Sequence, residues 1–327
     1  MSQVLITTVP FAQHNSLPIE LLEGLGADYS INPLGRRLTE DELCEMVGDA
    51  EVLIAGTEPI TARVMEAARN LRLISRVGVG LDSVDLGEAK RRGILVSYTP
   101  EAPAPAVADL TVGLILTLLR HVHIANAQMH RGEWTRYMGR RVPDITVGVI
   151  GTGRIGTRVL RRLAAFGSPR VLVNDLNPRP KLVEELKLEW VGKDTIYREA
   201  DVISVHVPLT ELTRGMIGRA ELQAMKPDAL LLNTARGGII DEEALLECLA
   251  EGRLGAVAMD VFVEEPYRGR LNEVERCLLT CHMGSMSVDC RTRMEIEATE
   301  EAVRHLAQEP LRSLVPDDEY SNQGRRA

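Results

Sequence analysis

Three segments in the second half of the chain carry side chains that could move a proton and bind an anion. They read NTARGGIID (233–241), AMDVFVEEP (258–266) and TCHMGS (280–285), and each follows an apolar run. They offer a guanidinium at Arg236, a carboxylate at Glu265 and an imidazole at His282. A fixed cation clamps an anion, and an imidazole tuned by a carboxylate gives or takes a proton. These residue types predict reduction of a 2-keto acid by hydride transfer.

Neighbouring residues leave parts of this assignment open. Glu264 stands beside Glu265, and adjacent carboxylates look alike in sequence. His206, which ends the run ADVISVHVP, is the other candidate imidazole, and we favour a structural or cofactor-adjacent role for it. Cys281 lacks an evident base and hydride chemistry needs no thiolate, so we expect a small apolar filler there. Arg236 could also be a surface cation at a strand end.

A glycine turn upstream of these segments predicts a dinucleotide site. The stretch VGVIGTGRIG (147–156) is an apolar strand followed by a helix that starts near Arg154. Gly151 allows a tight turn, Gly153 allows the backbone to approach a pyrophosphate, and Gly156 allows close packing of helix on strand. The sequence therefore places a cofactor at residues 151–156.

An acidic residue selects the cofactor. Asp175 ends the strand Arg170 to Asn174, 19 residues beyond Gly156, where a carboxylate can accept both adenosine ribose hydroxyls. A carboxylate there repels a 2′-phosphate, so the sequence predicts NAD rather than NADP. We interpret Arg179, nearby, as a solvated loop cation.

Composition limits the class of protein and its partners. The chain has 327 residues, 45% hydrophobic and 26% charged, enough to bury the cores of two ordinary domains. Its net charge is −9 without a basic block, so nucleic acid and an anionic membrane are unsuitable partners. Small-molecule binding remains the favoured class.

Cysteine usage and the amino terminus predict a cytoplasmic protein. The five cysteines have neither CxxC spacing nor an even count, so they indicate neither a disulfide framework nor a zinc site, and we expect no metal. The start MSQVLITTVP reads as a first strand rather than a signal peptide. The longest apolar stretch, Leu110 to Leu119, is far short of a membrane span.

The elements that position these groups alternate between strand and helix. Before residue 100, strands are predicted at 4–7, 52–55, 73–77 and 94–97, and helices at about 16–25, 39–47, 61–68 and 84–91. A Pro/Ala-rich link at 99–105 precedes one long helix over 106–129. Further strands are predicted at 145–150, 170–174, 201–207, 229–233 and 255–261, then an amphipathic helix at 288–306 and a disordered polar tail at 317–327.

This order predicts an α/β fold of two doubly wound domains. We expect a Rossmann NAD-binding domain inserted into a flavodoxin-like substrate domain. The expected boundaries are 1–102 for the first part of the substrate domain, 103–284 for the NAD-binding domain, and 285–327 for the returning helix and tail.

Six blocks of sequence resemble one enzyme family. They are RVGVGLDSVDL, VADLTVGLILTLLR, the glycine turn, HVPLT, NTARGGIID and AMDVFVEEP, and they occur in family order. Over residues 50–309 the chain resembles the NAD-dependent D-2-hydroxyacid dehydrogenases, and looks most like their short 3-phosphoglycerate dehydrogenase branch.

The resemblance implies a role for each matching residue. Arg236 would hold the substrate carboxylate and keto oxygen, His282 would exchange a proton with that oxygen, and Glu265 would favour the charged imidazole. Backbone groups of Val79 and Gly80 would contact the substrate carboxylate. The residues expected along the cofactor, besides the three glycines, are Arg154, Ile155, Asp175, His206, Val207, Pro208, Thr234, Ala235 and Asp260.

Departures from the family pattern leave the substrate open. The chain has Pro103 where Asn is common, Asp109 where Glu is usual, and Cys281 where Pro usually precedes the histidine. Arg76, beside the substrate loop, is placed with the substrate-binding residues and could bind a substrate phosphate. Arg36 or Arg37 could do so as well, although loop arginines are more often solvated.

These patterns predict an NAD-dependent dehydrogenase that interconverts a D-2-hydroxy acid and its 2-keto acid, and they leave open whether the substrate carries a phosphate. We expect it to resemble 3-phosphoglycerate dehydrogenase, with a hydroxypyruvate or glyoxylate reductase as the alternative. The resemblance also implies a homodimer formed through the nucleotide domain. A rival of another class is an NAD-sensing corepressor-type binding protein, since one fold can serve both functions.

Overall fold

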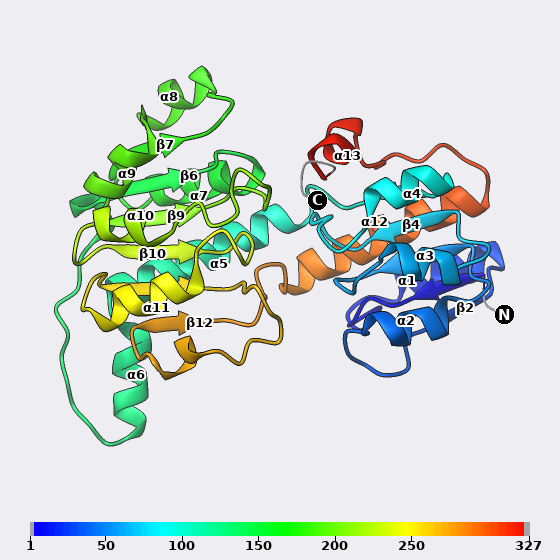
Figure 1. The fold of residues 1–327 in the computed structure, drawn as a ribbon, viewed down its shortest axis with the longest axis horizontal. Coiled ribbons are helices and arrows are strands. Elements are labelled where there is room, and N and C mark those ends of the chain that lie inside the picture. The colour runs from blue at the N-terminus through cyan, green and yellow to red at the C-terminus, as the bar shows by residue number, and fades with distance from the viewer. Residues whose placement is uncertain (1–2, 324–327) are drawn as a thin grey trace. The chain divides into compact units, whose positions relative to one another are not determined.

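The computed structural model describes residues 3–323, and the chain divides into two compact units (Figure 1). Unit 2 is the continuous segment Ala104–Ser285, and unit 1 is formed by the segments before and after it. Each unit contains one parallel sheet, of five strands in unit 1 and seven in unit 2. The predicted α/β class with two doubly wound sheets is confirmed.

The sheet of unit 1 has the strand order β2-β1-β3-β4-β5, which is the flavodoxin-like order. All neighbouring strands are parallel. Its central strands are short, mostly apolar and buried along their whole length, as strands covered by helices on both faces must be. The strands are β1 (Val4–Ile6), β2 (Tyr29–Ile31), β3 (Val52–Ala55), β4 (Leu73–Arg76) and β5 (Leu95–Ser97). The sequence analysis missed β2.

Side-chain caps fix where several helices of unit 1 begin. Thr39 and Glu42 form a capping box, and Asp85 accepts a hydrogen bond from the Glu88 amide. The helix predicted at 288–306 is present with those bounds and packs on α1 and β4. The helices are α1 (Leu17–Leu25), α2 (Glu40–Val47), α3 (Ala62–Ala67), α4 (Leu86–Arg92), α12 (Val288–Leu306) and α13 (Asp317–Gln323).

The prediction of a disordered tail is wrong for Asp317–Gln323, which forms α13. Three acidic residues open this helix, where they complement its dipole. Tyr320 packs on the apolar core of unit 1, and the Lys90 Nζ lies 5.4 Å from its ring centre. Tertiary packing thus orders a polar segment, and residues 324–327 lie outside the described part.

The sheet of unit 2 has the order β12-β11-β10-β9-β6-β7-β8. Read from β8 to β11, this is the Rossmann order 3-2-1-4-5-6, and β12 is one extra strand at the edge. The crevice expected for a ligand lies where the order reverses, between β6 and β9. The strands are β6 (Thr146–Ile150), β7 (Arg170–Asn174), β8 (Glu189–Trp190), β9 (Val202–Val205), β10 (Leu230–Asn233), β11 (Ala256–Met259) and β12 (Cys277–Leu279).

Helices cover both faces of this sheet, and two apolar clusters fill the space between. The α-helices are α5 (Pro103–Leu119), α6 (Val122–His130), α7 (Arg154–Ala164), α8 (Pro180–Leu186), α9 (Lys193–Glu199), α10 (Arg219–Ala224) and α11 (Glu242–Ala250). Two 3₁₀ turns, η1 (Val142–Asp144) and η2 (Arg270–Glu273), complete the unit.

The single long helix predicted over 106–129 is two helices. α5 starts earlier, at Pro103, because proline is tolerated in a first turn, where amide donors have no helical partner. The break comes at His121, whose φ of 54° is left-handed. Within residues 3–323 no single helix is long and apolar enough to span a membrane. α5 and α6 pass that test only as a pair, bent by 67°.

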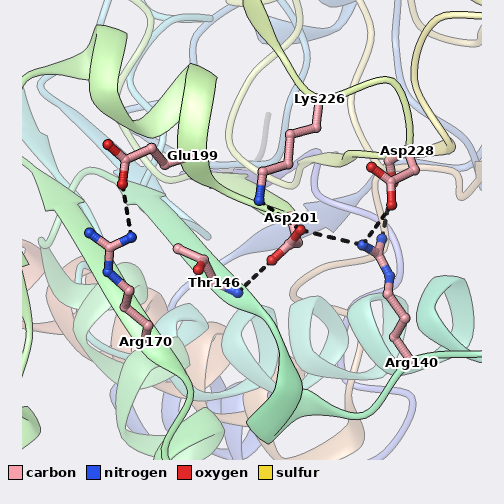
Figure 2. Close-up of polar contacts among 7 residues, drawn as sticks. All are labelled: Arg140, Thr146, Arg170, Glu199, Asp201, Lys226 and Asp228. Carbon is pink, nitrogen blue, oxygen red and sulfur yellow. Dashed lines mark hydrogen bonds and ion pairs between the residues drawn. The ribbon is translucent and has the colours of Figure 1, made fainter.

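A cluster of charged side chains closes the amino-terminal edge of this sheet (Figure 2). Asp201 accepts hydrogen bonds from the Thr146 amide (2.7 Å) and from the Lys226 Nζ (2.9 Å), and it pairs with Arg140 (3.5 Å). Arg140 also pairs with Asp228 (3.1 Å). The cluster therefore ties β6 and β9 to the segment that follows α6.

Candidate active site

The predicted functional residues of unit 2 lie at one edge of its sheet. All seven strands are parallel, so their carboxyl ends meet at the same edge. The glycine turn follows β6, Asp175 follows β7, His206 follows β9, Arg236 follows β10, Asp260 follows β11 and His282 follows β12. This edge is where open α/β sheets bind ligands.

The glycine turn has the shape that a pyrophosphate needs. Gly151 has a φ of +94°, and a Cβ there would lie 2.5 Å from the His206 carbonyl oxygen. A Cβ on Gly156 would overlap the Gly151 carbonyl oxygen. Gly153, the N-cap of α7, has open space where its Cβ would stand. Glycine is therefore required at Gly151 and Gly156, and the turn leaves the helix amides of α7 approachable by an anion.

Asp175 closes the turn from the neighbouring strand. Its Oδ2 accepts hydrogen bonds from the Thr152 amide (2.6 Å) and hydroxyl (2.9 Å), and its Oδ1 accepts one from the Asn177 amide (2.9 Å). Burial opposes ionisation, but these donors outweigh it and lower the pKa of Asp175. The carboxylate is therefore ionised and fixed beside the glycine turn, as recognition of a ribose hydroxyl requires.

His206 presents a buried nitrogen without a protein partner. Its Nε2 lies 2.8 Å from the Ser204 hydroxyl, whereas Nδ1 has neither solvent contact nor a hydrogen bond. Burial lowers the pKa of His206 to about 3, so the imidazole is neutral. An unsatisfied buried polar atom at the switch point is a place for a ligand group. With the glycine turn and Asp175, it fits a dinucleotide.

His282 and Glu265, the predicted acid–base pair, are in hydrogen-bond contact. The His282 Nδ1 lies 2.8 Å from the Glu265 Oε2, and the Glu265 Oε1 accepts a hydrogen bond from the Phe262 amide (3.1 Å). Both side chains are partly exposed. Glu264, the other candidate carboxylate, is exposed. The pairing leaves Nε2 as the ring atom that can exchange a proton with a substrate.

Asp260 builds the turn that carries His282. This carboxylate is 1% exposed and accepts hydrogen bonds from the Thr280 hydroxyl (2.6 Å) and from the amides of Met283 and Gly284 (both 2.9 Å). The His282 amide bonds to the Asp260 carbonyl (2.7 Å), and His282 itself has a left-handed φ of 51°. The residue predicted to contact the cofactor therefore also positions the imidazole.

The loop that carries Arg236 is fixed by its neighbours. The side chain of Asn233 is fully buried. It accepts a hydrogen bond from the Ala235 amide (3.0 Å) and donates one to the Arg236 carbonyl (2.8 Å). A Cβ on Gly237 would overlap the backbone of Phe262. Because Phe262 also binds Glu265, the loop of the cation and the loop of the acid are packed together.

The remaining predicted cofactor residues lie along the same edge with different exposure. Thr234 and Ala235 are buried, and the Thr234 hydroxyl lies 2.9 Å from that of Thr111. Ile155 and Val207 are partly exposed, and Arg154 and Pro208 are exposed. The expectation of an apolar filler at position 281 is wrong, because Cys281 is exposed.

In unit 1 the predicted substrate loop follows β4. Arg76 is 4% exposed, and its guanidinium donates to the Gly80 carbonyl from Nε (3.1 Å) and Nη2 (2.8 Å), and to the Ala55 carbonyl (3.3 Å). The Gly78 amide donates to the Thr99 hydroxyl (2.8 Å). Arg76 therefore shapes the loop that holds Val79 and Gly80, and it is not a solvated loop arginine.

Several positioning residues escaped the sequence analysis. Asn233, Thr99 and Thr111 act through hydrogen bonds between segments distant in sequence, which no local pattern reveals. Asn233 had one signal, because a polar residue at the end of the apolar run 229–232 must find partners inside the protein.

Comparison with known proteins gives consistent matches. The family described as D-isomer specific 2-hydroxyacid dehydrogenase, NAD binding domain, matches residues 112–284. A hydroxypyruvate reductase of Thermotoga maritima is 38% identical over 276 residues, which are 82% of this chain and 89% of that protein. A D-3-phosphoglycerate dehydrogenase of Methanocaldococcus jannaschii is 40% identical over 260 residues, 78% of this chain but 49% of that protein.

A solved structure supports the cofactor. The crystal structure of D-lactate dehydrogenase from Aquifex aeolicus, complexed with NAD and lactic acid, superposes with a TM-score of 0.83 at 27% identity. The match covers 93% of this chain and 96% of that one.

Proposed function

Because the chain belongs to the D-isomer specific 2-hydroxyacid dehydrogenase family, we propose that it reduces a small, unphosphorylated 2-keto acid such as hydroxypyruvate or glyoxylate. NAD-dependent D-2-hydroxyacid dehydrogenase activity is the property of the family. The observation that carries the proposal is the imidazole of His282 held at 2.8 Å by the Glu265 carboxylate.

Each site residue has a role that follows from its charge and its contacts. Bound NAD would exchange a hydride with substrate C2. Arg236 would neutralise the substrate carboxylate and polarise the keto group. The Nε2 of His282 would donate a proton to the keto oxygen, since Glu265 occupies Nδ1 and favours the charged ring. Amides of Val79 and Gly80 would bind the substrate carboxylate.

The contacts of the arginines favour a substrate without a phosphate. Arg76, a candidate phosphate ligand, donates instead to two backbone carbonyls. Arg36, another candidate, makes a two-pronged ion pair with Glu42. The hydroxypyruvate reductase relative is also matched along most of its length, whereas the phosphoglycerate dehydrogenase relative is matched over about half.

The test is a steady-state assay of NADH oxidation with hydroxypyruvate, glyoxylate, 2-ketoglutarate and phosphohydroxypyruvate. We expect the highest kcat/KM with hydroxypyruvate or glyoxylate. A higher kcat/KM with phosphohydroxypyruvate would contradict this proposal and would favour 3-phosphoglycerate dehydrogenase activity. Turnover of none of the four would favour the NAD-sensing binding protein.

His282→Ala separates a chemical role from a structural one. We expect turnover to fall by at least about a thousandfold while NADH affinity, measured by fluorescence titration, stays within about twofold. A collapse of NADH affinity in this variant would instead assign the residue to cofactor binding or folding.

We also propose a homodimer formed through unit 2, in the cytoplasm. α6 and the segment after it expose large apolar side chains, including Trp134 (79% exposed) and Met138 (93% exposed). Exposed apolar groups of this size are typical of protein contact surfaces. Light scattering should give twice the chain mass, and the double change Trp134→Glu, Met138→Glu should give a monomer.

A further inference from the structure

The carboxylate of Glu242 holds the loop that carries Glu265. Glu242 is the first residue of α11, and its Oε1 accepts a hydrogen bond from the Val263 amide (2.8 Å). The next residue back, Phe262, donates its own amide to Glu265. The Val263 side chain is 69% exposed, so its packing contributes little to the position of this loop. Phe262 is held by its buried side chain, and the Glu242 hydrogen bond holds the next residue, Val263, on the way to Glu265.

Glu242 also adds negative charge near the acid–base pair. Burial is the main cause that raises the pKa of Glu242, and the charges of Asp241 and Glu265 raise it further, against the hydrogen bond from Val263. The contacts place it nearby, because Glu242 binds the Val263 amide, the adjacent Phe262 amide binds Glu265, and Glu265 holds the imidazole of His282. On its own segment, Glu242 has the carboxylates of Asp241 and Glu243 as neighbours. The loop that follows Glu265 brings Tyr267 near Glu242, and it brings Arg270 into an ion pair with Glu243 (3.5 Å).

We propose that Glu242 is a positioning residue for the acid–base pair: it tethers the Glu265 loop through the Val263 amide and, when ionised, keeps His282 protonated to higher pH. This proposal rests on the proposed function. Because reduction of a keto group needs the protonated imidazole, the charge of Glu242 extends the pH range of reduction upward.

Three variants separate the tether from the charge. Glu242→Gln keeps an oxygen that accepts from Val263 but removes the charge, whereas Glu242→Ala removes both. Glu243→Gln removes the same charge from the neighbouring side chain, which is 70% exposed, and serves as the control. Thermal unfolding identifies any variant that does not fold, and the glutamine variant then decides the charge role by itself.

The kinetic readout is the pH profile of 2-keto acid reduction. Glu242→Gln should keep the plateau kcat within about threefold and move the midpoint of the alkaline decline down by about half a pH unit. Glu242→Ala should show the same shift and a plateau kcat lowered by about tenfold, because the acid is no longer held in place. Glu243→Gln should match the unmodified protein.

An NMR titration of the His282 ring tests the charge role without turnover. The ring signal is assigned by its loss in His282→Gln, and its midpoint should fall by about half a pH unit in Glu242→Gln. An unchanged His282 midpoint would overturn the charge role, and an unchanged kcat in folded Glu242→Ala would overturn the tether. If the unmodified protein reduces no 2-keto acid, the proposed function fails, yet this titration still gives its answer.

Discussion

The two units hold their predicted functional loops with buried charges of opposite sign. In unit 1, the Arg76 guanidinium donates to the carbonyls of Gly80 and Ala55. In unit 2, the Asp260 carboxylate accepts from the amides of Met283 and Gly284. The Arg76 cation binds carbonyl groups, so the amides of its loop stay available to an anionic ligand. The Asp260 carboxylate binds amides, so the amides of its turn are already used. The first arrangement suits binding of a carboxylate, and the second suits rigid support of a side chain.

Asp260→Ala should break the arrangement in unit 2 with the largest effect. Three donors, of which the Gly284 amide is buried and the other two are partly buried, would lose their charged acceptor, so the free energy of unfolding should fall by about 3 kcal/mol. The His282 turn would lose its support, and kcat should fall by at least about a hundredfold. Urea unfolding and steady-state kinetics measure both, with the exposed Glu264→Gln as control. A variant with nearly normal kcat would show that the turn holds its shape without Asp260.

Arg76→Met should break the arrangement in unit 1 with a smaller effect. The partly buried Gly80 carbonyl would lose both guanidinium donors, and the Ala55 carbonyl would keep only the Val77 amide, at a cost of about 2 kcal/mol in unfolding free energy. The loop of Val79 and Gly80 would bind the substrate less well, so KM for the 2-keto acid should rise by about tenfold with a smaller change in kcat. The exposed Arg72→Met is the matched control. A change in kcat alone would place Arg76 in the chemical step instead.

Lowering the pH should destabilise unit 2 before unit 1, which would sharpen the comparison between the two units. Burial lowers the pKa of His206 to about 3 from an ordinary value of 6.5, and burial also lowers the pKa of His123, likewise in unit 2. Between pH 6.5 and 3 the unfolded chain binds a proton at His206 that the folded protein does not. Stability should therefore fall with falling pH, by about 1.4 kcal/mol per pH unit for that proton.

The measurement is urea unfolding between pH 7 and pH 5, with hydrogen exchange to locate the loss. His206→Gln should have a shallower pH slope than the unmodified protein, while the exposed His14→Gln in unit 1 should keep the original slope. Equal slopes in all three proteins would mean that His206 does not control acid stability.

Arg140→Ala tests the opposite edge of the unit 2 sheet and should have the smallest effect. Its pairs with Asp201 and Asp228 are partly exposed, and such pairs contribute about 1 kcal/mol or less (Figure 2). Unfolding free energy should fall by that amount, with kcat and KM unchanged. An effect on kcat would mean that the amino-terminal edge influences the site at the carboxyl edge.

The sequence could predict elements whose signal is local. Apolar runs identified β3 and β7 with their observed bounds, and the spacing of the glycines identified the turn, in which Gly151 and Gly156 have a steric reason. The pairing of Glu265 with His282 was expected from the resemblance to a family. The geometry of that pair agrees with the expectation, and its chemical role stays a prediction.

Tertiary contacts decided what the sequence could not predict. The helix break at His121 has no glycine or proline to signal it, and α13 forms because Tyr320 finds an apolar surface. Arg76 was predicted to bind substrate because its burial and its backbone partners cannot be read from one residue and its neighbours. The positioning roles of Asp260 and Glu242 were not predicted, because their hydrogen-bond partners lie about 20 residues away in the sequence.

The split of unit 1 across the chain affects the order in which a newly made chain can fold. Unit 2 is one continuous segment, so it can complete its sheet once residue 285 has left the ribosome. The sheet of unit 1 is synthesised first but waits for α12, whose buried Met294, Ala298 and Ala302 arrive last. During that interval its apolar surface is open to a chaperone, and the segment before residue 104, which is made first, is among the last to become native.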